Sequence, residues 1–163
     1  MTKTVNSSMQ VMRLIVQKAR LCVDIQYVQK ILPLPMLETI PGSPKDVAGL
    51  MNVAGASVPV IDLALRLGLV RDQSYSMDMP IVLCTHHDKT IGWLVDAVLG
   101  LAIVHSDNLQ MQADFSSDAA WLAVVGIDSE LFFLLNMQRL LASGLSAETF
   151  TLPSEPLTKA ASP

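Results

Sequence analysis

The sequence is short of charged and aromatic residues. Of its 163 residues, 16% are charged and 5% are aromatic, whereas 51% are hydrophobic. A typical globular domain has about 25% charged residues. So low a charged fraction indicates strands that are buried on both faces, or a surface with an apolar docking site. We expect both features, with aliphatic side chains supplying most of the core.

The sequence also lacks a long apolar run. A helix that spans a membrane needs about 20 mostly apolar residues. The best candidate, residues 91–104, is too short, contains two glycines and has Asp96 near its middle. The first residues, MTKTVNSSMQ, lack the apolar core of a signal peptide. These absences predict a cytoplasmic protein that is not inserted in a membrane.

Few residues are arranged for metal, disulfide or nucleic-acid chemistry. Cys22 and Cys84 lie far apart and outside any CxxC pattern, which favours two buried thiols. His86 and His87 are adjacent, so in a strand or turn their side chains point to opposite faces and cannot readily hold one ion. The net charge of −4 and the scattered basic residues disfavour nucleic acid. We expect no metal, no cofactor and no nucleic-acid partner.

No arrangement of residues that is typical of an enzyme active site is present. The sequence has no GxSxG nucleophile motif and no glycine-rich phosphate loop. Asp24, Asp62 and Asp96 each lie singly among apolar neighbours, a setting more typical of a cap or turn than of paired catalytic acids. The sequence predicts a protein that is not an enzyme.

Short apolar segments, several with a period of two, predict many strands. Residues 71–79 and 108–119 are expected to be loops, the first of them dividing two comparable halves. Regularly spaced short strands favour small β-barrels over a parallel sheet. The predicted strands are Met9–Gln17, Ala19–Ile25, Tyr27–Leu34, Ala56–Ile61, Pro80–Thr85, Ile91–Val95, Leu99–Val104, Leu122–Val125 and Leu131–Leu135.

Three polar residues are placed to cap short helices. Ser43 stands before a proline, which is favoured at the first helical position. Asp62 and Asn136 each precede a short apolar segment that ends at a glycine. The expected helices cover residues 45–51, 63–67 and 137–143.

Four segments, in this order and spacing, resemble the CheW family of bacterial chemosensory adaptors: Val28–Ile31, Ile40–Leu69, Ile91–Val98 and Leu134–Ser143. The same domain forms the regulatory module of CheA histidine kinases. The resemblance covers about residues 9–145. It implies a mainly β fold of two intertwined, SH3-like five-stranded barrels with short helices and a C-terminal helix. Residues 1–8 would be a flexible N-terminus and 146–163 a disordered tail.

The resemblance also implies a function. In the family, a groove between the barrels receives the tip of a methyl-accepting chemoreceptor, and separate barrel faces pair with the regulatory domain of the kinase. The chain would be a non-catalytic adaptor between the two. The alternative is a divergent module that has a different partner or senses a small molecule. The sequence does not distinguish between a flagellar pathway, a type IV pilus pathway and another chemosensory pathway.

Thirteen positions fall within motifs of the family, and the resemblance implies that they serve partner binding. Two of them depart from the family pattern: Lys30 stands where the family has an acid, and Ala54 where it has an arginine. The missing arginine removes a common interface anchor, and the reversed charge favours a different partner. The positions are Val28, Lys30, Ile31, Gly49, Asn52, Ala54, Gly55, Pro59, Ile61, Gly92, Val95, Asp96 and Val98.

Overall fold

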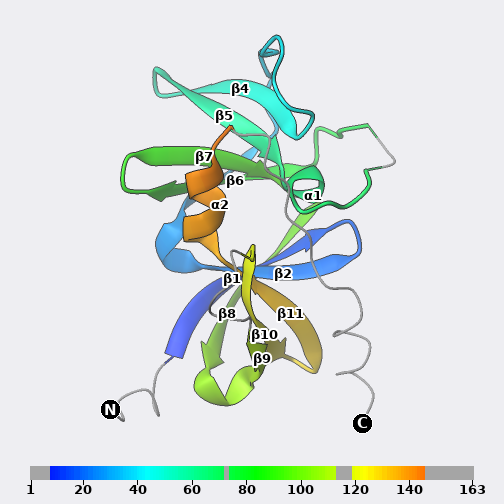
Figure 1. Ribbon diagram of the computed structural model, residues 1–163, viewed down its shortest axis with the longest axis vertical. Coiled ribbons are helices and arrows are strands. Elements are labelled where there is room, and N and C mark those ends of the chain that lie inside the picture. Colours follow the sequence, from blue (N-terminus) through cyan, green and yellow to red (C-terminus); the bar gives the residue numbers. More distant parts are fainter. Residues whose placement is uncertain (1–7, 72–73, 113–118, 146–163) are drawn as a thin grey trace.

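Two β-sheets lie one above the other in the computed structural model, which describes residues 8–71, 74–112 and 119–145 (Figure 1). We call the six-stranded lower sheet in this view sheet A, and the five-stranded upper sheet B. This arrangement confirms the predicted mainly β architecture. The predicted N-terminal segment before residue 8 and the tail after residue 145 lie outside the described residues.

Sheet A combines the two ends of the domain, because the N-terminal hairpin joins strands from the C-terminal half. Neighbouring strands are antiparallel, except that β2 and β11 run parallel. The strands in spatial order are β8 (Ala97–His105), β1 (Ser8–Val16), β2 (Ala19–Asp24), β11 (Glu130–Leu135), β10 (Trp121–Ile127) and β9 (Leu109–Gln112).

One strand of sheet A was not predicted. Residues 108–119 were expected to be a loop, but β9 pairs with β10 along residues 109–112. Three of its four residues are exposed, so the segment shows no alternation of buried and exposed positions. Its extended form depends on pairing with a distant strand, which sequence periodicity does not report. Residues 113–118 lie outside the described part of the chain.

Sheet B holds the middle of the chain. Its strands in spatial order are β3 (Val28–Pro33), β6 (Pro80–His86), β7 (Lys89–Leu94), β5 (Ala56–Asp62) and β4 (Val47–Val53). The predicted loop, of which residues 71 and 74–79 are described, lies between β5 and β6, and both strands belong to sheet B. The prediction that this loop divides two halves is therefore wrong.

The helix predicted over residues 45–51 is also wrong, because β4 occupies most of this segment. Val47, Gly49 and Met51 are buried at every second position, which is the period of a strand. A side chain at Gly49 would meet the carbonyl oxygen of Glu38 at 2.6 Å, where the Glu38 segment pairs with β4. Ser43 caps no helix, and its amide donates to the carbonyl of Ile40 in a turn.

The other two predicted caps are confirmed. The Asp62 carboxylate accepts hydrogen bonds from the amides of residues 64 and 65 at the start of α1 (Leu63–Arg66). Asn136 accepts from the amide of residue 139 at the start of α2 (Met137–Ser143), which ends at Gly144 with φ 52°. Short 3-10 turns, η2 (Ile25–Tyr27) and η3 (Ser106–Asn108), complete the described elements.

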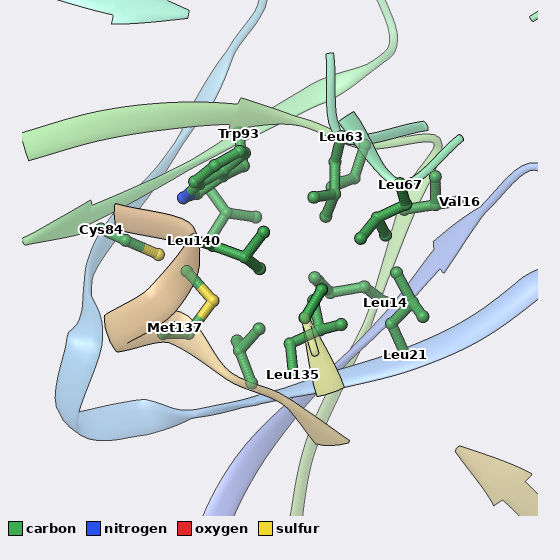
Figure 2. Close-up of a cluster of buried hydrophobic side chains, with 14 of the residues drawn as sticks. Leu14, Val16, Leu21, Leu63, Leu67, Cys84, Trp93, Leu135, Met137 and Leu140 are labelled. Atoms are coloured by element: carbon green, nitrogen blue, oxygen red, sulfur yellow. The ribbon is translucent and has the colours of Figure 1, made fainter. Parts of the chain in front are cut away.

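A single apolar cluster joins the two sheets, and we call it the junction core (Figure 2). Leu14 and Leu21 reach it from sheet A, Trp93 from sheet B and Leu140 from α2. All four side chains are at most 1% exposed. Fully burying a side chain of this size contributes roughly 1.5–3 kcal/mol. Two smaller apolar clusters each belong to one sheet, so the junction core is the cluster that holds the two sheets together.

Candidate protein-interaction surface

A β-bulge in β3 places two predicted partner-binding residues on one face. Val28 pairs with Cys84 and Ile31 pairs with Val82, and the register shifts between Val28 and Lys30. Residues three apart on a regular strand point to opposite faces, whereas the extra residue of a bulge restores the same face. Both paired residues of β6 belong to the junction core. Val28 and Ile31 therefore face the junction side of sheet B, where Ile31 is 42% exposed.

The same device recurs at the edge of sheet A. Val98 pairs with Leu14 and Leu101 pairs with Met12, and the register between β1 and β8 shifts between these pairs. Leu14 and Met12 both belong to the junction core. The bulge thus turns Val98 and Leu101 toward the junction, although three positions separate them. Ile103, two residues further on, continues the same face.

The outer strand β8 exposes three large aliphatic side chains. Leu99, Leu101 and Ile103 are 44%, 49% and 60% exposed. Large apolar residues that gather in this way on one strand make a candidate interaction surface. Leu101 and Ile103 were not among the predicted residues, because the segment is apolar at nearly every position. That pattern reveals a strand, but not which of its faces is open.

The two departures from the family pattern lie in different places. Lys30 is exposed on β3 beside Ile31, and no hydrogen bond or ion pair reaches its ammonium group from the described residues. Ala54 and Gly55 form the turn between β4 and β5, with φ of 50° and 89°. Asn52 stabilises this turn by accepting a hydrogen bond from the Gly55 amide at 3.1 Å. This hairpin stands at the edge of sheet B opposite β3.

The remaining positions of the predicted set serve the fold. Ile61 and Val95 are 0% exposed, so they cannot contact a partner directly. A Cβ atom at Gly92 would lie 2.8 Å from a methyl group of Ile81, so glycine is needed for packing. Pro59 lies in the interior strand β5, where it pairs with Leu50 of β4.

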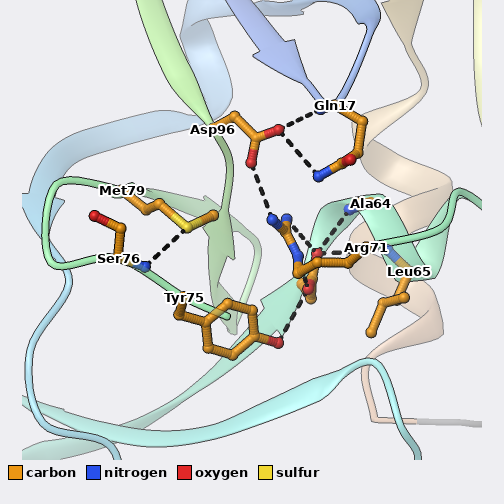
Figure 3. A network of polar contacts seen from close by, with 9 residues as sticks. Gln17, Ala64, Leu65, Arg71, Tyr75, Ser76, Met79 and Asp96 are labelled. Atoms are coloured by element: carbon orange, nitrogen blue, oxygen red, sulfur yellow. Dashed lines mark hydrogen bonds and ion pairs between the residues drawn. The ribbon is translucent and has the colours of Figure 1, made fainter. Parts of the chain in front are cut away.

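A buried ionic network connects the sheets beside this surface (Figure 3). The guanidinium of Arg71 donates twice to Asp62, at 2.5 and 2.9 Å, and once to Asp96 at 3.1 Å. The other oxygen of Asp96 accepts from the backbone amide and side chain of Gln17, in the turn between β1 and β2. The Tyr75 hydroxyl also donates to Asp62, at 3.0 Å. Asp96, which was expected to contact a partner, therefore belongs to an internal network, and no sequence motif indicated Arg71.

The surroundings of this network shift the pKa of two of its groups. Burial alone would lower the pKa of Arg71, but the hydrogen bonds and charges of Asp62 and Asp96 outweigh burial and raise it. Burial and the neighbouring Asp62 carboxylate raise the pKa of Tyr75 to about 12. Arg71 therefore remains a cation and Tyr75 a neutral donor at physiological pH.

A pocket of about 460 Å³ opens beside the network. Seven of its eight lining residues are polar or charged, and they come from the turn between β1 and β2, the segment before β6 and the crossing after β7. The lining residues are Gln17, Lys18, Arg71, Ser74, Ser76, Asp78, Met79 and Asp96.

Features that would indicate a metal site or a membrane span are not found in the described residues. No group of three or more His, Cys, Asp or Glu side chains in residues 8–71, 74–112 and 119–145 could hold a metal ion. Within the same residues, no helix is long and apolar enough to cross a bilayer. Cys22 and Cys84 are free and buried, and burial raises the pKa of each thiol to about 12.

Residues 10–144 match the protein family described as the CheW-like domain. The chain belongs to this family. The match spans both sheets, both bulged edges and α2, so the CheW-like domain includes every element described above. The sequence resemblance to the CheW family is confirmed.

Individual relatives agree with this assignment. The chain is 30% identical to a probable chemotaxis protein CheW of Rhizobium etli, over 73% of this chain and 78% of that protein. It is 23% identical to the chemotaxis protein CheW of Klebsiella aerogenes, over 74% of each chain. The crystal structure of the scaffolding protein TtCheW from Thermoanaerobacter tengcongensis superposes with a TM-score of 0.75 at 19% identity, covering 90% of this chain and 100% of that one. The last comparison shows the fold of the CheW-like domain, and the first two support the predicted class of chemotaxis adaptor.

Proposed function

We propose that this CheW-like chain is a non-catalytic cytoplasmic adaptor that couples chemoreceptors to a CheA-type histidine kinase in a bacterial chemosensory pathway. The observation that carries the proposal is the aliphatic surface of β8, where Leu99, Leu101 and Ile103 are exposed at the margin of the junction core. A surface of this kind suits a partner with its own apolar stripe. The helical tip of a receptor has that chemistry.

The two bulged strands would form opposite sides of the receptor site. We call Val98, Leu101 and Ile103 the β8 edge, and Val28 and Ile31 the β3 edge. Each edge presents aliphatic side chains on the face that is directed at the junction core. A helix placed against both edges would cover the exposed parts of these side chains. Each Å² of apolar surface removed from water contributes about 25 cal/mol.

The kinase module would bind elsewhere on sheet B. The β4–β5 hairpin, with Asn52, Ala54 and Gly55, stands at the edge opposite β3. All three residues are exposed, and the hydrogen bond from Gly55 to Asn52 fixes the shape of the turn. Partners at opposite edges of one sheet need not compete. An adaptor requires this separation because it must hold both partners at once.

The polar groups of the chain support a scaffold rather than an enzyme. Arg71 bonds both Asp62 and Asp96, and each carboxylate also accepts from a backbone amide, so none of these groups is poised to act on a substrate. The thiols of Cys22 and Cys84 are buried with a raised pKa, which makes them weak nucleophiles.

The proposal is tested by assembling the complex from purified parts. The kinase regulatory domain and a receptor cytoplasmic fragment from the same organism are titrated separately into the full chain, and then together. We expect each to bind alone, and a ternary complex by analytical ultracentrifugation. Failure of both titrations would refute the proposal, and mutually exclusive binding would refute the assignment of separate edges.

A second candidate function is the sensing of a small polar molecule, and the pocket of about 460 Å³ beside Arg71 favours it. Its volume is within the usual range of ligand sites, about 300–1,000 Å³. A thermal-shift screen against a metabolite library is the test. A rise in melting temperature that is lost on replacing Lys18, which lines the pocket, with alanine would support this function.

A further inference from the structure

The chain crosses from sheet B to sheet A through Val95 and Asp96, between β7 and β8. The amide of Val95 donates to the carbonyl of Pro80 in sheet B at 3.1 Å. The amide of Asp96 donates to the carbonyl of Ile15 in sheet A at 3.0 Å. One residue later β8 begins, and Val98 already belongs to the β8 edge. The position of this crossing therefore determines where the β8 edge starts.

Arg71 attaches the crossing to the end of sheet B. Asp62, the last residue of β5, is fully buried and accepts hydrogen bonds from two nitrogens of the fork-shaped Arg71 guanidinium. The remaining nitrogen of the fork reaches Asp96, whose second oxygen is held by the Gln17 turn of sheet A. A single guanidinium thus joins a carboxylate of sheet B to a carboxylate that is bonded to sheet A. Lysine could not make these three directed bonds from one planar group.

We infer that Arg71 is a positioning residue for the partner surface, holding the β8 edge at a fixed angle to the β3 edge. This inference rests on the proposed adaptor function, because it assigns the two edges to one receptor site. Arg71 itself does not contact the receptor. It acts through Asp96, which stands two residues before Val98.

A second buried arginine makes the role of Arg71 more specific. Arg66 donates to Asp46, the residue just before β4. It also donates to the Ser143 hydroxyl and to the Gly144 carbonyl at the end of α2. It therefore holds α2 against α1, on elements that carry neither edge. Arg71 is bonded instead to the segment that leads into β8. The two arginines hold different parts of the molecule together.

The variant Arg71→Lys keeps the charge beside Asp62 but cannot reproduce the fork. The control is Arg13→Lys, because Arg13 forms an ion pair with Asp128 at 3.5 Å and both residues belong to sheet A or its turn. Removing the arginine would leave two carboxylates uncompensated, which can prevent folding. Asp96→Asn is the second variant, since it keeps the shape of the side chain and removes only its charge.

The first readout is the distance between the sheets. Cysteines are introduced at two exposed positions, Ser57 in sheet B and Glu130 in sheet A, and carry spin labels. Pulsed electron paramagnetic resonance then measures the distance between the labels. The native thiols are buried and have a raised pKa, so the introduced ones react selectively. We expect the distance distribution to broaden in Arg71→Lys and in Asp96→Asn, and to stay unchanged in Arg13→Lys.

The second readout is the affinity for the receptor fragment. We expect a loss of roughly tenfold in Arg71→Lys and Asp96→Asn, within the range that remote couplings reach. Arg13→Lys should bind as the wild type does. An unchanged distance distribution in both variants would overturn the inference, and so would a broadened distribution with unchanged affinity. A wild-type chain that fails to bind the receptor fragment overturns the adaptor function instead, while the label distances still decide whether Arg71 sets the angle.

Discussion

The β8 edge and the β3 edge share one backbone device and differ in chemistry. Each strand contains a bulge that turns two residues, three positions apart, toward the junction core. The β8 edge and its neighbour Leu99 are aliphatic throughout, whereas β3 carries the exposed Lys30 between Val28 and Ile31. Lys30 pairs with Leu83, so it lies beside the β3 edge but points to the other face of sheet B, and its charge acts on a partner from a distance. Apolar area contributes affinity for many partners, while a fixed charge discriminates between them. The difference suggests that β8 supplies most of the binding energy and that β3 selects the partner.

The largest effect should come from disrupting the β8 edge. We expect Leu101→Asp to weaken receptor binding roughly thirtyfold, about 2 kcal/mol, because it replaces an anchor with a charge that must be desolvated. Isothermal titration with the receptor fragment measures this. Leu122→Asp is the control, since Leu122 is 47% exposed but lies on β10. Equal losses in the two variants would show that β8 has no special role.

The next effect concerns the two buried thiols. Cys84 pairs with Val28 under the β3 edge, and Cys22 lies inside sheet A. Their pKa is raised to about 12 in the folded chain, from an ordinary value of 9.0. The unfolded chain loses these protons first as the pH rises above 9. The thiols therefore leave the free energy of unfolding unchanged below pH 9. Between pH 9 and 12 each thiol lowers the free energy of unfolding by up to about 1.4 kcal/mol per pH unit.

Urea unfolding at pH 8 and pH 10.5 measures this loss of stability. Cys84→Ala and Cys22→Ala should each lose less stability over this interval than the wild type does. If the three curves shift in parallel, the thiols do not titrate as their burial requires.

A smaller effect should come from the β3 side. We expect Lys30→Glu to change the affinity for the chain's own receptor by about fivefold, in the unfavourable direction, because an exposed charge contributes up to about 1 kcal/mol. The change should shrink as salt is raised from 50 to 500 mM. Lys45→Glu makes the same charge change at an exposed site away from β3. A salt-independent change, or an equal one in Lys45→Glu, would contradict the selective role of Lys30.

The smallest effect tests whether the β4–β5 hairpin is separate from both edges. Ala54 has φ 50° before Gly55, a conformation that asparagine tolerates better than alanine does. We expect Ala54→Asn to stabilise the fold by about 0.5 kcal/mol without changing receptor affinity. Thermal unfolding and the receptor titration measure the two quantities. A change in receptor affinity would place this turn at the receptor site.

Local signals in the sequence were sufficient for the caps and for most strands. Asp62 and Asn136 cap helices as predicted, because a cap depends only on the residues next to it. The helix expected after Ser43 failed because β4 pairs with β5 in a hairpin on one side and with the Glu38 segment on the other. Strand pairing of this kind outweighs local helix preference.

The sequence predicted part of the interaction surface for the same reason. Motif matching identified Val28, Ile31 and Val98, but it could not reveal the bulges that bring them to the junction side. It grouped these residues with Ile61 and Val95, which are fully buried. Arg71 was overlooked because its loop is polar and its partner Asp96 stands 25 residues away. Its role follows only from the folded chain.

The interwoven order of strands has a consequence for biosynthesis. Sheet B is complete once residue 94 has been made, whereas β1 and β2 must wait for β8 and β11 before sheet A can close. The N-terminal hairpin therefore remains without its partner strands while most of the chain is synthesised. A nascent chain that stops before β11 would leave β2 with a bare edge, open to mispairing with a neighbouring polypeptide.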